Sequence, residues 1–364
     1  MQMELFDFLP EEEAKQYKPL PSNDWKWTMA NDYPKEKNGL KVFSCFACGG
    51  GSTMGYKLAG CEVLGCNEID PRMNKVYVEN HNPKYNYLED IRDFNKREDL
   101  PEELYNLDIL DGSPPCTTFS TVGKREESWG IKKKFREGQV EQTLDDLSFV
   151  FIETVAKLMP KCVIMENVEG LIKGEAWGYV KKIYNQFHDV GYKVRHWLLK
   201  GENMGIPQQR HRVFFIALRN DIDFPLDKLD MTFNYEPVYY KDIKTGDGET
   251  PTEYQKSLLD LAKNGDENMG CIYFRLHGKE TGFSDKIVWD NDIMQTITAN
   301  GKIFRGKDKT KISTEDIING STFPQDYNFI DEKPRYICGM SVPPIMIKRI
   351  VNRLIESTIF DGKK

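Results

Sequence analysis

A cysteine that directly follows two prolines is the residue of this 364-residue chain best suited to covalent chemistry. Pro114 and Pro115 restrict the backbone before Cys116, so they hold its thiol at a fixed place. A free thiol has a pKa of about 8.5 and needs a nearby donor, base or helix end to act as a nucleophile at neutral pH. Taken alone, Cys116 is equally well explained as a small buried core residue.

Polar residues and glycines follow other apolar runs of the sequence. Glu166 and Asn167 end the run CVIMENV, where a partly desolvated carboxyl has a raised pKa and acts as an acid. Three glycines, 49 to 51, follow LKVFSCF, where they let a ligand approach the backbone and a following helix start offers N–H groups. Glu68 ends the next apolar run, a place from which a carboxylate accepts hydrogen bonds from both hydroxyls of a ribose. This pattern predicts a site for a cofactor that contains adenosine.

The elements that position these residues alternate between strand and helix patterns. A helix pattern follows the glycines and stops at Gly60. The apolar runs read as strands at residues 40–46, 61–70, 107–112, 162–168, 192–199 and 211–218, and helical patterns occupy 144–159, 177–191 and 343–360. This order predicts an α/β fold with a mostly parallel, doubly wound sheet. Ligands bind such sheets at the carboxyl ends of the strands, where the candidate residues stand.

Changes in composition along the chain predict its domain organisation. Residues 1–39 are polar and contain prolines, and we interpret them as an N-terminal extension. Residues 40–220 carry the alternating strands and helices of a catalytic, cofactor-binding domain. Residues 221–300 are irregular, charged and rich in aromatic side chains, which indicates a second, smaller lobe. Residues 301–364 end in a helical pattern, and we expect this segment to return to the catalytic domain.

Composition and charge exclude several classes of protein. Hydrophobic residues make up 39% of the chain, but no apolar run approaches the roughly 20 residues of a membrane helix. The first residues lack the basic and apolar regions of a secretion signal, so we expect a cytoplasmic protein with reduced cysteines and no membrane contact. A net charge of -7 excludes a uniformly basic DNA-coating protein, although basic stretches stand at 124–125, 132–136 and 302–311.

Four of the eight cysteines leave a metal site open as an alternative. Cys45, Cys48, Cys61 and Cys66 have spacings that zinc ligands also show. The apolar run around Cys45 and the glycines after Cys48 fit a strand that enters a cofactor loop better. We therefore expect no metal site.

The ordered motifs together resemble those of the cytosine-C5 DNA methyltransferase family, of the bacterial or phage type. The matching segments, in the family's order, are Phe46 to Gly51, Asn67 to Asp70, Asp90-Ile91, Pro114 to Ser120, Glu166 to Val168, Gln208 to Arg212, Ile312 to Asp316 with Phe323-Pro324, and Gly339 to Pro343. They span about residues 40–220 and 290–358. The chain departs from the family pattern at Cys48, where the family has glycine, at Thr117, where it has glutamine, and at Met340, where it has asparagine.

The resemblance implies transfer of a methyl group from S-adenosyl-L-methionine, which becomes S-adenosyl-L-homocysteine, to C5 of a cytosine flipped out of duplex DNA. A covalent bond between Cys116 and C6 activates the base. The catalytic residues implied are Cys116, Glu166, Arg210 and Arg212. The cofactor-binding residues implied are Phe46, Ala47, Gly49, Gly50, Gly51, Glu68, Ile69, Asp90, Ile91, Pro114 and Ser341. The residues we expect to contact DNA are Ser120, Lys124, Arg125, Gln209, Arg275 and Thr298.

Three other functions and several partners remain open at this point. The same chemistry on transfer RNA is one alternative, an NAD-dependent oxidoreductase is another, and a catalytically inactive DNA-binding module is the third. Cys48 puts the glycines out of register with G-x-G-x-x-G, which weakens the NAD interpretation. Gln2, Leu5 and Phe6 match the Q-x-x-L-F peptide with which bacterial replication proteins bind the sliding clamp. We also consider a companion restriction endonuclease and expect a monomer.

Overall fold

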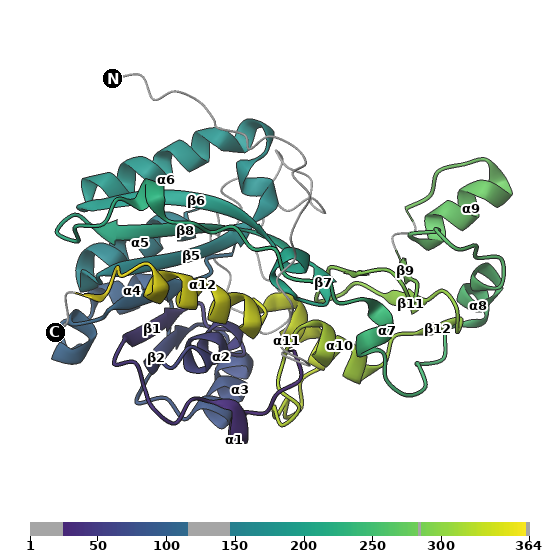
Figure 1. Cartoon of the computed structure of the whole chain (residues 1–364), viewed down its shortest axis with the longest axis horizontal. Coiled ribbons are helices and arrows are strands. Elements are labelled where there is room, and N and C mark those ends of the chain that lie inside the picture. Colours follow the sequence, from purple (N-terminus) through teal and green to yellow (C-terminus); the bar gives the residue numbers. More distant parts are fainter. Residues whose placement is uncertain (1–24, 116–145, 283–284, 362–364) are drawn as a thin grey trace.

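A seven-stranded sheet forms the centre of the computed structural model, which describes residues 25–115, 146–282 and 285–361 (Figure 1). Its strand order is β3-β2-β1-β4-β5-β8-β6. The strands are β1 Lys41–Cys45, β2 Glu62–Glu68, β3 Tyr85–Leu88, β4 Ile109–Gly112, β5 Cys162–Val168, β6 Tyr192–Lys200 and β8 His211–Arg219. β1 to β5 run parallel, and β8 runs antiparallel to both of its neighbours, β5 and β6. The predicted α/β class with a mostly parallel sheet is confirmed.

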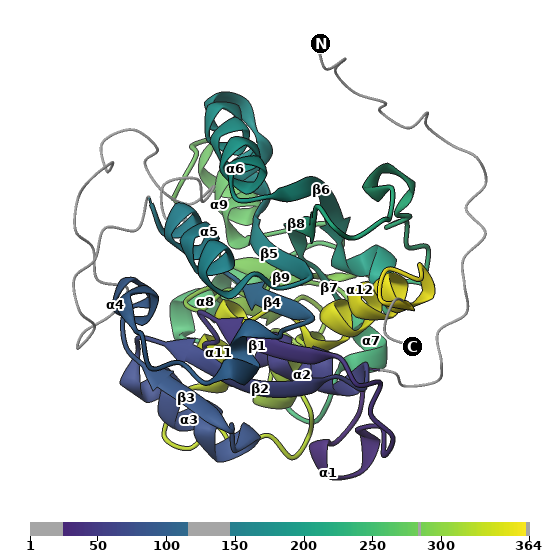
Figure 2. The ribbon, with the colours of Figure 1, turned by 90° about the vertical axis from the view of Figure 1, so that its left-hand side faces the viewer.

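Helices cover both faces of this sheet, because successive side chains of a strand point to opposite faces. In β1, Val42 belongs to one hydrophobic core and Phe43 to the other. The first core includes side chains of α2 (Gly51–Leu58), α3 (Pro71–His81) and α12 (Pro344–Glu356). The second includes side chains of α4 (Ile91–Lys96), α5 (Leu147–Leu158) and α6 (Trp177–Asp189). Figure 2 shows α4, α5 and α6 on one side of the sheet and α12 on the other.

A smaller lobe projects from one end of the sheet (Figure 1). It contains a three-stranded sheet of β9 (Lys286–Val288), β11 (Ile303–Arg305) and β12 (Thr310–Lys311), with α8 (Glu253–Leu259) and α9 (Met269–His277). Leu258, Met269, Ile287 and Phe304 are among the residues of its separate core. Because β11 pairs with β9 and β12 pairs with β11, this sheet crosses the boundary that we placed at residue 300.

The remaining elements connect the two parts. β7 (Gln208–Gln209) pairs with β10 (Met294–Gln295), and α7 (Tyr240–Ile243), α10 (Thr314–Gly320) and α11 (Pro334–Met340) lie between the sheet and the small lobe (Figure 1). Short 3-10 helices occupy Glu102–Tyr105, Glu169–Ile172, Gly174–Ala176, Gly201–Met204 and Leu226–Lys228.

Part of the segment interpreted as an N-terminal extension packs on the part of the molecule that contains the seven-stranded sheet. Trp25 and Trp27 are buried in the core shared with α2 and α12, before the short helix α1 (Met29–Asp32). The indole Nε1 of Trp27 donates a hydrogen bond to the carbonyl oxygen of Thr322, at 2.9 Å. Gln2, Leu5 and Phe6 lie outside the described residues. Within the described ranges, no helix has the length and apolar character to cross a membrane.

Candidate active site

Glu166 and Arg212 meet as an ion pair at the carboxyl end of β5. Glu166 follows the apolar part of β5. Arg212 is the second residue of the neighbouring strand β8, where it pairs with Val168. Glu166 and Val168 share one face of the sheet, so this register places the two charged side chains diagonally across the strands. Nε of Arg212 lies 2.8 Å from Oε1 of Glu166, and the side chains are 16% and 12% exposed. The pair is therefore held in a mostly desolvated place at the edge of the sheet where ligands bind.

Asn167 connects this pair to the predicted nucleophile loop. Its side chain is 2% exposed, and its Nδ2 donates a hydrogen bond to the carbonyl oxygen of Pro114, at 3.3 Å. This bond fixes the backbone two residues before Cys116 in the sequence. Cys116 itself lies outside the described residues, as do Ser120, Lys124 and Arg125.

Arg210 lies buried beneath the connection between the two lobes and holds backbone groups. It is 2% exposed, and its Nη1 and Nη2 donate hydrogen bonds of 3.2 Å to the carbonyl oxygens of Ile297 and Gly339. Burial and the neighbouring Arg212 lower the pKa of Arg210. The contacts indicate a side chain that positions the polypeptide around the site.

The predicted cofactor loop follows β1 in an unusual backbone conformation. Phe46, Cys48 and Gly50 have φ values of 55°, 47° and 84°. Left-handed backbone is unfavourable for a residue with a side chain. The loop nevertheless adopts this conformation at Cys48, where the family has glycine. Oε2 of Glu68 accepts a hydrogen bond from the Cys48 N–H at 2.7 Å, and Oε1 accepts one from the Asp70 N–H at 2.8 Å. Glu68 thereby stabilises the turn of the loop.

The three glycines of the loop are packed against protein. A Cβ at Gly49 would lie 2.7 Å from the hydroxyl of Tyr327, and one at Gly50 would lie 2.1 Å from Nε2 of His81. A Cβ at Gly51 would lie 2.8 Å from Cβ of Ser341. The absence of side chains at these positions lets His81 on α3 and the segment around residues 327–342 pack directly against the loop.

Several observations fit an adenosine cofactor with an amino-acid end. Ser341, beside Gly51 at the start of α2, is 5% exposed, and its Oγ has no hydrogen-bond partner among the described residues. A hydroxyl next to a helix N-terminus is suited to a carboxylate. Burial raises the pKa of Glu68, whose oxygens keep further lone pairs for ribose hydroxyls.

The other predicted cofactor residues surround the ends of the strands. Asp90 is the N-cap of α4 and accepts from the Arg92 N–H at 2.8 Å, while Ile91 is buried. Ala47 is buried and Ile69 is half-buried. Phe46 packs against Phe151, with ring centroids 6.3 Å apart. Asp90 is half-buried and lies at the start of α4, so its carboxylate is partly exposed to solvent.

Asp111 is a buried acid that the sequence analysis did not single out. It accepts hydrogen bonds from Oγ of Ser44 at 2.6 Å and from the hydroxyl of Tyr56 at 3.0 Å. Burial raises its pKa to about 7, and the charge of Glu166 contributes in the same direction. The sequence does carry a signal for this buried acid, because Asp111 is the second aspartate, after Asp108, within the apolar run LDILDG.

The described residues that we expected to contact DNA lie in the small lobe and its connection. Gln209 is exposed on β7, and Thr298 is exposed with its Oγ1 accepting from the Gly301 N–H at 3.0 Å. Arg275 forms hydrogen bonds of 2.8 and 2.9 Å with the two carboxylate oxygens of Asp266, and a further one with the carbonyl of Leu261. Arg275 is thus engaged in the internal structure of the small lobe.

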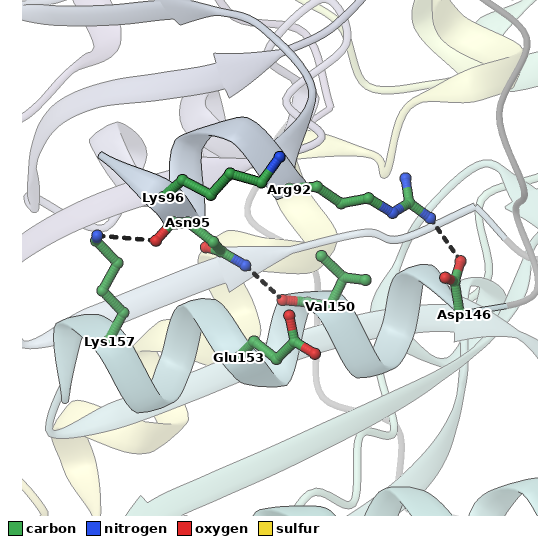
Figure 3. A pocket seen from close by; sticks show the side chains of 7 residues that line it. All are labelled: Arg92, Asn95, Lys96, Asp146, Val150, Glu153 and Lys157. Carbon is green, nitrogen blue, oxygen red and sulfur yellow. Dashed lines mark hydrogen bonds and ion pairs between the residues drawn. The ribbon is translucent and has the colours of Figure 1, made fainter. Parts of the chain in front are cut away.

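A separate hollow of about 580 Å³ lies between α4 and α5 (Figure 3). Arg92 pairs with Asp146 at 2.6 Å, and Nζ of Lys157 donates to the backbone oxygen of Asn95 at 3.0 Å. Because these cations already have partners, we assign no ligand to this hollow. Across the described part of the chain, no cluster of three or more His, Cys, Asp or Glu side chains is arranged to hold a metal ion. Cys45, Cys61 and Cys66 are buried.

Comparison with known proteins agrees with this arrangement. The family model for C-5 cytosine-specific DNA methylase matches residues 40–356. The Type II methyltransferase M.NgoPII of Neisseria gonorrhoeae is 30% identical over 218 residues, which cover 59% of this chain and 59% of that protein. M.Bsp6I of Bacillus sp. (strain RFL6), another Type II methyltransferase, is 25% identical over 340 residues, covering 88% of this chain and 100% of that protein.

The matched segments span 59%, 48% and 61% of the first three curated relatives, about half to three-fifths of their length. Among solved structures, the Spodoptera frugiperda DNMT2 chain superimposes with a TM-score of 0.61 at 16% identity, covering 87% of this chain and 100% of that one. That likeness concerns the fold. The family match extends over both lobes and all the motif positions described above, and the chain therefore belongs to the C-5 cytosine-specific DNA methylase family.

Proposed function

We propose that this chain transfers a methyl group from S-adenosyl-L-methionine to C5 of cytosine in a specific sequence of duplex DNA. The observation that carries the proposal is the joined arrangement at the end of β5. There Glu166 pairs with Arg212, and Asn167 binds the backbone of Pro114, just before Cys116. An acid and a cation from two distant segments thus meet at one edge of the sheet, and Asn167 between them and Pro114 binds the backbone that leads to the proposed nucleophile.

The chemistry follows from the roles of these side chains. C5 of cytosine is a weak nucleophile, and addition of the Cys116 thiolate to C6 breaks the ring's conjugation and makes C5 electron-rich. Glu166 supplies the proton or hydrogen bond at N3 that stabilises this adduct. Nε of Arg212 is used by Glu166 and Nη1 by the carbonyl of His211, so we propose Nη2 for O2 of the base. Once C5 carries the methyl group, loss of the C5 proton expels the Cys116 thiolate and restores the aromatic ring.

The cofactor site is proposed at the loop after β1. When bound, S-adenosyl-L-methionine supplies the electrophilic methyl group that C5 takes up. Glu68 would accept from the ribose hydroxyls, Ser341 would bind the amino-acid end, and Asp90 would lie toward the adenine. The unpartnered Oγ of Ser341 and the helix start at Gly51 support this placement.

The small lobe favours DNA over transfer RNA as the substrate, because the family branch that methylates transfer RNA lacks a large recognition lobe. We propose residues 40–220 with the C-terminal segment as the catalytic domain, and residues 221 to about 311 as the target-recognition domain. The upper boundary follows the end of β12. Contacts with a sliding clamp through Gln2, Leu5 and Phe6, a companion endonuclease, a monomeric state and a cytoplasmic location are further proposals.

Incubation of the full chain with methyl-labelled S-adenosyl-L-methionine and either duplex DNA or transfer RNA tests the activity. We expect label in DNA only, and bisulfite sequencing should show protected cytosines within one recurring sequence. The variant Cys116→Ser should lose this activity. Label in transfer RNA alone would show that transfer RNA, and not DNA, is the substrate. A rise in the melting temperature of the protein with NAD but none with S-adenosyl-L-methionine would favour an oxidoreductase.

A further inference from the structure

The backbone carbonyl of Gly49, in the middle of the proposed cofactor loop, is held by two side chains from distant parts of the chain. The hydroxyl of Tyr327 donates a hydrogen bond to this oxygen at 2.5 Å. Nε2 of His81 lies 3.3 Å from the same oxygen. Neither residue belongs to the catalytic steps above, and neither ends a strand of the sheet.

His81 is the last residue of α3 and acts as a neutral donor. It is 7% exposed, and its ring packs edge-on against Tyr77, with centroids 4.7 Å apart. Burial, together with the charge of Lys57, lowers the pKa of His81 to about 3, so the ring is uncharged at neutral pH. A carbonyl oxygen only accepts hydrogen bonds, so Nε2 must carry the proton. Nδ1 is then an acceptor, and it has no partner among the described residues.

Tyr327 reaches the loop from the segment between α10 and α11. Its ring packs against Phe323 and Phe329, with centroids 5.1 and 4.7 Å away, and its side chain is buried. Burial raises the pKa of Tyr327 well above its usual range, so its hydroxyl stays protonated and donates. The aromatic contacts fix the ring, and the hydroxyl therefore meets Gly49 in one position.

The loop needs such support because its backbone is unfavourable by itself. Cys48 and Phe46 lie in the left-handed region, which is unfavourable for residues that carry a Cβ. Glu68 binds the Cys48 N–H on one side of the turn, while His81 and Tyr327 bind the next carbonyl along the chain. Gly49 and Gly50 admit both donors, since a Cβ at either position would overlap with one of them.

We propose that His81 and Tyr327 are positioning residues that hold the Gly49 carbonyl and so preset the cofactor loop for S-adenosyl-L-methionine. The inference rests on the proposed cofactor site. The two donors restrict the conformation of the loop before the cofactor binds. Cofactor binding therefore costs less conformational entropy of the loop. They act on cofactor affinity and leave the groups at the end of β5 in place.

Three variants of the full chain test this role. Tyr327→Phe removes the hydroxyl and keeps the ring, and His81→Leu removes the ring donor. His81→Gln places an amide N–H near the position of Nε2. We expect Tyr327→Phe and His81→Leu each to weaken binding of S-adenosyl-L-homocysteine, measured by calorimetry, and to raise the KM for S-adenosyl-L-methionine by about tenfold. The kcat at saturating cofactor should stay within about twofold, and His81→Gln should recover most of the affinity.

Tyr192→Phe is the matched control. Tyr192 is equally buried and donates a hydrogen bond of 2.6 Å to the carbonyl of Pro160, in the core on the other face of the sheet. Tyr192→Phe should lower the free energy of unfolding by about as much as Tyr327→Phe does, and it should leave the KM for S-adenosyl-L-methionine unchanged. An unchanged KM in Tyr327→Phe and His81→Leu, or equal KM changes in Tyr192→Phe, would overturn the inference. Absence of cofactor binding by the unaltered chain would instead overturn the proposed function.

Discussion

At the scale of single residues, the orientation of Glu166 depends on Arg212. Their ion pair is mostly buried, so the guanidinium keeps the carboxylate in one orientation at the place where a base would enter. Arg212 is in turn fixed by a hydrogen bond of 2.7 Å to the carbonyl of His211. The orientation of the proposed acid is therefore set before the substrate binds.

Replacement of Glu166 by glutamine tests its role as the acid. Glu166→Gln keeps the shape of the side chain but cannot exchange a proton with N3. We expect methyl transfer to fall by about 10²- to 10⁴-fold, in single-turnover assays with labelled cofactor. Binding of S-adenosyl-L-homocysteine should stay within about twofold. Glu153→Gln, an exposed change on α5, is the control and should retain full activity. Full activity in Glu166→Gln would exclude the proposed role.

The pH dependence of stability reports on Asp111. Burial raises its pKa in the folded protein to about 7, against about 3.9 in an unfolded chain. At pH values between these two pKa values, Asp111 is protonated in the folded state and deprotonated in the unfolded state. The stability from this proton is fully present below about pH 4 and is lost as pH rises through about 7.

Asp111→Asn should remove this dependence. We expect the free energy of unfolding, from urea titrations at pH 5 and pH 8, to differ less between the two pH values than in the unaltered chain. Asp99→Asn, which changes an exposed carboxylate beside Arg97, should keep the original difference. Equal pH dependence in Asp111→Asn and the unaltered chain would contradict a titrating Asp111.

At the scale of elements, Arg210, which directly follows β7, joins the segment between β10 and β11 to α11. Arg210→Ala would leave the carbonyls of Ile297 and Gly339 buried without this donor. We expect a loss of about 2 kcal/mol in the free energy of unfolding, measured by chemical denaturation. Arg195→Ala is the control, because its hydrogen bond to the carbonyl of Asp227 is exposed. A loss in Arg210→Ala no greater than in this control would argue against a positioning role.

The elements that the sequence predicted well are those with uninterrupted apolar runs. β1, β4, β5 and β8 are buried, and each appears as such a run. β3 went unpredicted because it is an edge strand with alternating exposure and the polar sequence YNYL. The antiparallel direction of β8 also has no signature in its sequence, since direction depends on the connection through β6 and the residues after it.

The same distinction holds for the site. Glu166, Glu68 and the glycines stand at the ends of apolar runs, so local sequence was enough to find them. His81 and Tyr327 act through contacts with residues 32 and 278 positions away, and no local pattern marks such a partner. The resemblance to family motifs named the catalytic set, whereas the packing that supports the cofactor loop needed the structure.

At the scale of the whole molecule, a buried ion pair connects the three-stranded sheet of the small lobe to α10. Arg305 on β11 and Asp316 on α10 are 2.8 Å apart and 2% and 0% exposed. The hydroxyl of Tyr240 donates to the same carboxylate oxygen at 2.5 Å. This contact ties the orientation of the small lobe to α10.

Arg305→Met should break this connection. Removing one partner of a buried pair costs about 3–5 kcal/mol, because the other charge stays buried without it. We expect faster hydrogen exchange at the amides of β9 and β11, with unchanged exchange in β1 and β4. Lys309→Met is the control, since its ion pair with Asp260 is exposed and is worth at most about 1 kcal/mol. Equal exchange in the two variants would show that the pair does not hold the lobe.

The hydrogen bond between Gly49 and Tyr327 also has a consequence for synthesis on the ribosome. The two residues are 278 positions apart. At roughly 5–20 residues per second, Tyr327 is made on the order of tens of seconds after the loop that it holds. α12, which packs on α2 and closes the same core, is made later still. A nascent chain therefore carries the strands of the site long before it has a finished cofactor loop, and a chain truncated before residue 327 would never complete one.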